Sequence, residues 1–252
     1  MMTTIKTAMI LAAGLGTRLR PLTLTNPKPL LPINNIPCIQ YIVSDLKNLG
    51  IEKIVINTHY LAEKIHTYFH DDPQIMLIHE KEILETGGGI QNAIQELDDV
   101  FMTVNGDIWF NNPEIFEHML KAFDAKIMDA LLMMVPIKNA LYFSKEGDYY
   151  PKKSDAEITF PLVHKNHQIQ TDECPTYIYG GVQIWSKKEF LKYKSHDKTY
   201  PMLPVFHVAE KKNRLWGIRY NHLWCDIGTQ EAYLSLNKTD LCYLQEYRHA
   251  CG

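Results

Sequence analysis

The sequence predicts an α/β protein in which helices cover both sides of a largely parallel β-sheet. Short apolar runs bounded by turn residues alternate with segments whose apolar residues recur every three or four positions. With 252 residues, 46% of them hydrophobic, the chain is large enough to bury such a sheet. We therefore expect a three-layer sandwich with a mostly parallel, mixed central sheet, built as one domain over residues 1–252.

The first half of the chain carries the regular alternation. Strands are predicted at the apolar runs 6–12, 53–57, 75–79, 101–107 and 130–137. Helices are predicted between them at 39–50, 61–69, 89–97 and 113–123. The first of these helices places its apolar residues on one face and reaches Gly50, a residue typical of a helix C-terminus.

After about residue 138 the pattern is less regular. Strands are predicted at 156–163 and 176–185, and short helices at 187–193 and 203–212. The segment 214–228 is interpreted either as a hairpin or as two separate sheet strands. Because no linker, low-complexity tract or repeat interrupts the chain, a single domain is favoured.

Composition excludes several classes of protein. The net charge of −3 argues against a nucleic-acid partner, which requires a basic face. No apolar run approaches the roughly 20 residues of a membrane span, and the N-terminal sequence lacks a signal-peptide pattern, so we expect a cytoplasmic protein without a membrane partner. The scattered cysteines predict reduced thiols rather than disulfides or a cysteine zinc site: Cys38, Cys174, Cys225, Cys242 and Cys251.

The segment "AAGLGTRLRP", residues 12–21, follows the first predicted strand and has the features of a phosphate-binding loop. Gly14 and Gly16 allow the backbone to approach a ligand closely, and adjacent amide groups bind phosphate oxygens. Arg18 adds a permanently charged, planar group that suits phosphate, and Lys28 adds a second cation. Prolines at 21, 27, 29 and 32 restrict the loop. The pattern favours a stiff triphosphate-binding loop over an ordinary surface loop.

Two better-known nucleotide motifs do not fit this loop. The dinucleotide fingerprint requires a third glycine where this sequence has Leu19, and the Walker pattern requires a GK[ST] triplet that does not occur. Neither class of nucleotide-binding protein is therefore indicated.

Two aspartates follow apolar runs far apart in the sequence. Asp107 lies in "VNGDIW" and Asp226 in "WCDIGT". Mg²⁺ is held by one or two carboxylates together with substrate phosphates, so the two side chains are candidates for one magnesium site. Each aspartate alone is also a good turn or helix-cap residue.

Three glycines in "LETGGG", residues 84–89, precede a helical pattern. One interpretation is that their backbone approaches a flat ring or a sugar. The other is that they form a permissive helix N-terminus, and the residues alone do not separate the two.

Taken together, these segments resemble the sugar-1-phosphate nucleotidyltransferases, whose central sheet is Rossmann-like. "LAAGLGTRLRPLT" followed by "PKPLLP" is similar to their N-terminal signature, and "LETGGG", "VNGDIW" and "WCDIGT" follow in the family order. The resemblance covers about residues 6–237. Within the family the chain is most similar to the short members, the N-acetylmuramate-1-phosphate uridylyltransferases and the mannose-1-phosphate guanylyltransferase-like proteins.

The resemblance implies a role for each motif. Arg18 would contact the pyrophosphate leaving group and Lys28 the phosphates, while Asp107 and Asp226 would hold Mg²⁺. Gly180 or Gly181 would lie near the sugar. The residues implied around the nucleotide are Leu11, Ala12, Gly14, Gly16, Thr17, Glu85, Gly87 and Asn105.

The implied reaction joins a nucleoside triphosphate, UTP or GTP, to a sugar-1-phosphate and releases pyrophosphate. Many relatives carry an EKP motif whose lysine meets the sugar phosphate, but this sequence has none, and Lys165 is the substitute considered. An alternative of another class is a non-catalytic nucleotide-sugar sensor. The sequence indicates no particular oligomeric state.

Overall fold

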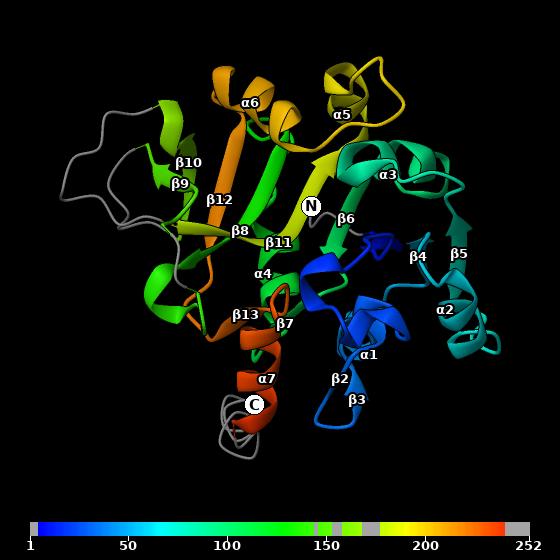
Figure 1. The fold of residues 1–252 in the computed structure, drawn as a ribbon. Helices are drawn as coiled ribbons and strands as arrows, with labels where there is room; N and C mark the ends of the chain where they lie inside the picture. Colours follow the sequence, from blue (N-terminus) through cyan, green and yellow to red (C-terminus); the bar gives the residue numbers. More distant parts are fainter. Residues whose placement is uncertain (1–4, 144–145, 153–157, 168–176, 240–252) are drawn as a thin grey trace.

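The computed structural model describes residues 5–143, 146–152, 158–167 and 177–239 (Figure 1). The strands of its central sheet are β1 (Thr7–Leu11), β4 (Lys53–Thr58), β5 (Ile75–His79), β6 (Val100–Asn105), β8 (Ala130–Pro136), β9 (Tyr149–Pro151), β10 (Thr159–His164), β11 (Tyr177–Ser186) and β12 (Leu215–Arg219). They pair in the order β5-β4-β1-β6-β11-β8-β12-β10-β9. Because only β10 and β11 run against the other seven strands, the sheet is mixed and mostly parallel, as the sequence predicts.

Helices pack on both faces of this sheet. The helices are α1 (Cys38–Asn48), α2 (Ala62–Tyr68), α3 (Glu85–Ala93), α4 (Ile115–Ala122), α5 (Lys187–Tyr193), α6 (Leu203–Lys211) and α7 (Gln230–Lys238). Strand β1 shows how the faces divide: Ala8 and Ile10 pack in the apolar cluster that contains α1, α2 and α4. Met9 packs in the cluster of α3, α5 and α6. The alternating side chains of the strand thus separate two apolar layers, which confirms the three-layer sandwich.

The glycine-rich segment is where the helix bounds differ most from the prediction. Helix α3 begins at Glu85, so the three glycines lie inside it rather than before it. A Cβ atom on Gly87 would lie 2.3 Å from the ring of Tyr200, and one on Gly88 would lie 2.4 Å from the carbonyl oxygen of Lys198. The glycines therefore allow helix and loop backbones to pack closely, a requirement set by residues far away in the sequence.

The segment 214–228 forms two strands that belong to different sheets. Strand β12 joins the central sheet, whereas β13 (Trp224–Asp226) pairs antiparallel with β7 (Ile108–Phe110). A short hairpin of β2 (Pro32–Ile33) and β3 (Ile36–Pro37) lies nearby, and a third apolar cluster joins these strands to α7. The segment is thus two separate strands and not a hairpin.

Cysteines of the described residues are buried thiols. Cys38 and Cys225 are both buried and free, in agreement with the expectation of reduced cysteines at these positions. Cys174, Cys242 and Cys251 lie outside the described residues, as do residues 156–157 of the strand predicted at 156–163.

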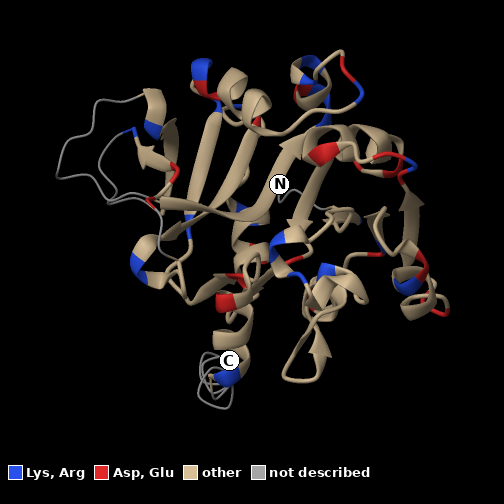
Figure 2. Cartoon of the chain, in the orientation of Figure 1, with Lys and Arg blue, Asp and Glu red and all other residues tan. Residues whose placement is uncertain are grey.

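Charged residues lie mostly on helices and loops, whereas the strands are nearly free of them (Figure 2). This distribution is expected, because charge is costly inside a sheet covered on both faces. No described helix is both long enough and apolar enough to cross a membrane.

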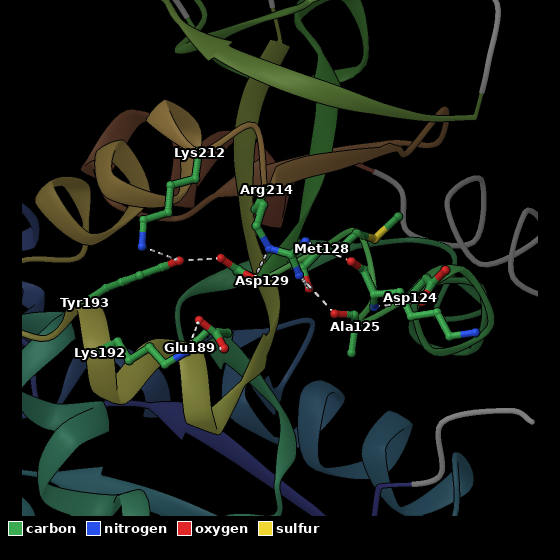
Figure 3. Close-up of polar contacts among 10 residues, drawn as sticks. Asp124, Ala125, Met128, Asp129, Glu189, Lys192, Tyr193, Lys212 and Arg214 are labelled. Carbon is green, nitrogen blue, oxygen red and sulfur yellow. Dashed lines mark hydrogen bonds and ion pairs between the residues drawn. The ribbon is translucent and has the colours of Figure 1, made fainter.

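The carboxyl group of Asp129, just before β8, is nevertheless buried, and Figure 3 shows its polar contacts. Asp129 is 0% exposed. Its carboxylate accepts hydrogen bonds from Nε of Arg214 and from the hydroxyl of Tyr193, the latter at 2.5 Å. Nζ of Lys212 donates to the Tyr193 oxygen at 3.1 Å, and Nη2 of Arg214 donates to the carbonyl of Ala125 at 3.0 Å. We call this the Asp129 group; it joins α5, the α6–β12 connection and the start of β8.

Candidate active site

The loop after β1 is folded into three short 3-10 helices, Thr17–Leu19, Leu22–Leu24 and Lys28–Leu30. Gly16 has a left-handed backbone (φ +60°), and a Cβ atom there would lie 2.9 Å from Cγ2 of Thr23. The Thr23 hydroxyl donates to the Gly16 carbonyl at 2.8 Å. The loop is therefore held by its own contacts, and Gly16 is required at its turn.

A cavity of about 200 Å³ opens where β1, β4 and β6 end. The residues that line it are Leu11, Ala13, Gly14, Asn57, Glu80, Ile83, Glu85, Thr86, Asn105 and Asp107. They include four of the residues predicted around the nucleotide: Leu11, Gly14, Glu85 and Asn105. The other four predicted positions, Ala12, Gly16, Thr17 and Gly87, are not part of this lining. The carboxyl ends of parallel strands are the usual place for a ligand site in such a sheet.

The wall of the cavity contains a buried polar pair that sequence reasoning missed. Oδ1 of Asn57 accepts a hydrogen bond from the amide of Ala12 at 2.9 Å, and its Nδ2 donates to Oε1 of Glu80 at 2.7 Å. A Cβ atom on Gly89 would lie 2.9 Å from both side chains. Asn57 thus fixes the start of the loop that follows β1, and the available signal was its place at the end of a predicted strand.

The two predicted metal aspartates are neighbours in the structure. Antiparallel pairing of β7 with β13 sets Asp226 opposite Ile108, the residue after Asp107. The ammonium group of Lys28 forms an ion pair with Asp107 and lies 3.6 Å from Oδ1 of Asp226. Lys28 is 8% exposed. The structure therefore brings together three of the four residues predicted to act on phosphate and metal, and we call them the Lys28 group.

Electrostatics in this group favour a cation. Burial raises the pKa of Asp226, and the carboxylate of Asp107 raises it further. Burial lowers the pKa of Lys28, but both carboxylates act in the opposite direction, and the pKa is raised overall. Two hard carboxylates in contact with one positive charge are a donor set that fits Mg²⁺.

Arg18, the fourth predicted residue, is exposed. Arg18 and Asp226 both lie against Gly228. A Cβ atom on Gly228 would lie 2.9 Å from Nη2 of Arg18 and 2.8 Å from Oδ1 of Asp226. The amide of Gly228 also hydrogen-bonds to Asp226, which partly opposes the rise in the pKa of that carboxyl. Sequence reasoning did not identify Gly228, because "DIGT" indicates only a turn. Its lack of a side chain allows Arg18 to lie close to Asp226.

Gly180 and Gly181, the glycines predicted near the sugar, lie in β11, and Gly181 contacts Asn105. The register of β11 against β8 shifts between Tyr179 and Gln183, which creates an irregularity at Gly180 and Gly181. Gly181 has φ +81°, and a Cβ atom there would lie 3.0 Å from Nδ2 of Asn105. Both glycines are buried and neither lines the cavity.

Lys165, the lysine considered for the sugar phosphate, follows β10 in a short 3-10 helix. Strand β10 runs against β12, so its end lies at the edge of the sheet opposite the cavity. The structure therefore does not bring Lys165 to the candidate site.

Helices cover both faces of a mostly parallel sheet, and a polar cavity opens at the carboxyl ends of its strands. This arrangement is typical of ligand-binding α/β proteins. The family described as nucleotidyl transferase matches residues 7–145, more than half of the sequence. The chain belongs to the nucleotidyl transferase family.

Two relatives are similar over most of this chain. It is 29% identical to N-acetylmuramate alpha-1-phosphate uridylyltransferase of Caulobacter vibrioides, over 91% of this chain and 95% of the relative. It is 39% identical to mannose-1-phosphate guanylyltransferase of Mycobacterium tuberculosis, over 90% of this chain and 62% of the relative. The crystal structure of UDP-glucose pyrophosphorylase with UDP-glucose is 18% identical, with a TM-score of 0.74 over 95% of this chain and 100% of that chain, and shows the same fold.

Proposed function

We propose that this protein transfers a nucleotidyl group from UTP or GTP to a sugar-1-phosphate and releases pyrophosphate. The observation that best supports this proposal is the contact of Lys28 with Asp107 and Asp226 beside the cavity. Arg18 lies close to Asp226. Both relatives named above act on a sugar-1-phosphate, one with a uridylyl and one with a guanylyl group. We propose N-acetylmuramate-1-phosphate with UTP first and mannose-1-phosphate with GTP as the alternative.

The proposed reaction needs no protein base. A phosphate monoester with a second pKa near 6 is mostly dianionic at neutral pH. One of its oxygens attacks the α-phosphorus, a new phosphorus–oxygen bond forms, and the bond to the bridging oxygen breaks. The electron pair leaves with pyrophosphate, so no proton has to move in this step.

Repulsion between the two anionic substrates is the main barrier that the protein has to lower. Arg18 offers a bidentate contact to the leaving pyrophosphate, and Lys28 offers a point charge to the phosphates. Asp107 and Asp226 would hold Mg²⁺, which neutralises phosphate charge when bound. The stiff loop between Gly16 and Lys28 keeps both cations in place before substrate arrives.

The substrates are proposed to lie along the cavity. Leu11, Gly14 and Asn105 would lie near the base and ribose, together with Glu85. Gly181 supports the sugar end through its contact with Asn105. Strands from both halves of the chain join one continuous sheet, in which β6 pairs with β11, and this supports one domain over 1–252. We propose that it acts in the cytoplasm, where nucleoside triphosphates are made.

The first test is pyrophosphate release from a panel of four nucleoside triphosphates and four sugar-1-phosphates, those of N-acetylmuramate, mannose, glucose and N-acetylglucosamine. We expect magnesium-dependent turnover with one uridylyl or guanylyl pair. Binding of a nucleotide sugar without turnover of any pair would favour the sensor and contradict the proposal.

The second test asks whether the aspartates share one metal ion. Asp107→Asn and Asp226→Asn should each lose most activity and require more magnesium. The double variant should be little worse than the poorer single variant, since residues that act as a unit are not additive. Full activity of Asp226→Asn at an unchanged magnesium requirement would leave Asp107 as the sole metal carboxylate.

A further inference from the structure

Two histidines and a glutamate meet at the edge of the sheet opposite the cavity. His167 follows β10, whereas His207 and Glu210 lie on α6. Their potential ligand atoms lie within 4.8 Å of one another, and no other three metal-ligating side chains of the described residues come so close. In Figure 1 this region is at the top of the view, away from β7 and β13 at the bottom.

Local structure preorganises these side chains. His207 and Glu210 are three residues apart on one helix, so both face the same side. Nδ1 of His167 lies 2.9 Å from Oε1 of Glu210, and the amide of His164 donates to the same oxygen at 3.1 Å. The rings of His167 and His207 have their centroids 4.5 Å apart. The group is therefore assembled by contacts between α6 and the end of β10.

Two buried polar atoms of this group have no hydrogen-bond partner among the described residues. The Glu210 side chain is only 7% exposed. Its Oε2 atom and Nε2 of His207 are buried, and neither has a hydrogen-bond partner in the described part of the chain. A buried polar atom without a partner is costly and requires an explanation. Here two such atoms, both good metal ligands, occur in the same small cluster.

We propose that His167, His207 and Glu210 bind a divalent transition-metal ion, in the first instance Zn²⁺. Zinc binds imidazole nitrogen and carboxylate oxygen, and two histidines with one glutamate leave one tetrahedral position for water. Mg²⁺ prefers six oxygen ligands and does not suit this set. The site is thus chemically distinct from the magnesium site proposed at Asp107 and Asp226.

Binding requires only a small closure. Ligand bonds of about 2.0–2.2 Å place tetrahedral ligand atoms roughly 3.3–3.6 Å apart, so ligand atoms that now lie within 4.8 Å of one another need only small shifts. His167 is exposed and already contacts Glu210, whereas Glu210 is buried on α6, so the exposed imidazole makes most of the adjustment. The bound ion then links α6 to the end of β10 and stabilises this edge of the sheet.

The binding test uses full-length protein treated with a chelator and titrated with Zn²⁺ in excess Mg²⁺, which occupies the oxygen-rich site. We expect wild type to bind one more Zn²⁺ per chain than Glu210→Gln and His207→Gln, or to bind that ion at least about tenfold more tightly. Glu210→Gln retains Oε1 as an acceptor for the His164 amide, so the helix contact survives. His118→Gln, which changes an exposed histidine of α4, is the matched control and should bind like wild type.

Two further readouts do not depend on activity. Co²⁺ in the wild-type protein should give the visible absorption of a four-coordinate site, and Glu210→Gln should lose it. Zn²⁺ should raise the Tm of wild type and His118→Gln but not of Glu210→Gln. Equal zinc stoichiometry and affinity in wild type and Glu210→Gln would overturn the proposal. If circular dichroism shows that neither variant folds, the wild-type Co²⁺ spectrum decides, and absent visible bands reject the site.

Discussion

The Asp129 group and the Lys28 group both hold charge inside the protein, at opposite edges of the sheet. Asp129 is completely buried, and its carboxylate is matched by donors from Arg214 and Tyr193. In the Lys28 group one ammonium group faces two carboxylates, whose side chains are 30% and 39% exposed. The first group satisfies its charges internally, whereas the two carboxylates of the second lie beside a cavity and have only Lys28 and the exposed Arg18 as cationic neighbours.

We interpret this difference as one between a structural arrangement of charge and the proposed catalytic one. A paired buried carboxylate contributes to stability only while its partners remain, because the unpaired charge is very costly. Partly exposed carboxylates that are incompletely paired destabilise the free protein but attract a metal ion. Mutations in the two groups should therefore have different effects on stability and activity.

The largest effect is expected for Asp129→Asn. It removes the charge that Arg214 and Tyr193 surround, and breaking a buried pair costs about 3–5 kcal/mol of unfolding free energy. Urea unfolding measures this loss. Asp71→Asn, which changes an exposed carboxylate, is the control and should be nearly neutral. A stable Asp129→Asn variant would remove the distinction between the two groups.

Arg18→Ala should reduce kcat/KM by the equivalent of about 2–4 kcal/mol, because it removes a phosphate contact from the proposed transition state. Stability should hardly change, since Arg18 is exposed. Arg18→Lys should restore little activity because lysine lacks the planar, bidentate group. Steady-state kinetics at limiting triphosphate measure kcat/KM of wild type and both variants. Unchanged turnover of Arg18→Ala would show that this loop does not bind the triphosphate.

Tyr193→Phe should have a smaller effect on stability than Asp129→Asn. Burial raises the pKa of Tyr193, and its hydrogen bond to Asp129 raises it further, so the hydroxyl remains a donor at physiological pH. Removing it leaves the carboxylate with one donor fewer, at a cost of about 1–3 kcal/mol. Tyr68→Phe, at an exposed tyrosine, provides the matched control in the same unfolding experiment. Equal stabilities of the two variants would mean that the Asp129 contact contributes nothing.

The smallest change in stability, with the opposite sign, is expected for Asp226→Asn. Burial and Asp107 raise the pKa of Asp226 in the folded state, so its ionised form costs stability above that pKa. The variant should have a slightly higher Tm than wild type at neutral pH while it loses activity. As pH falls through the pKa of Asp226, the wild-type carboxyl protonates and the difference should vanish. A lower Tm at neutral pH would mean that pairing with Lys28 outweighs burial.

The sequence predicted the strands of the first half closely because their signal is local. Predicted runs at 53–57 and 75–79 correspond to β4 and β5, since apolar composition and flanking turn residues act over a few positions. The candidate site was predicted in part for a related reason. Arg18, Lys28 and Asp107 follow strands whose ends meet at one edge of a parallel sheet.

Other features required the folded chain. The glycines of α3 are explained by Tyr200 and Lys198, and the position of Asp226 by the pairing of β13 with β7. Likewise, no motif in the sequence links His167 to Glu210, although the structure places them 2.9 Å apart. The sequence by itself determined the layered α/β class and the cationic loop, because periodicity and turn chemistry are local properties. Only the tertiary structure decided which side chains meet, because contacts between distant segments depend on strand register and helix packing.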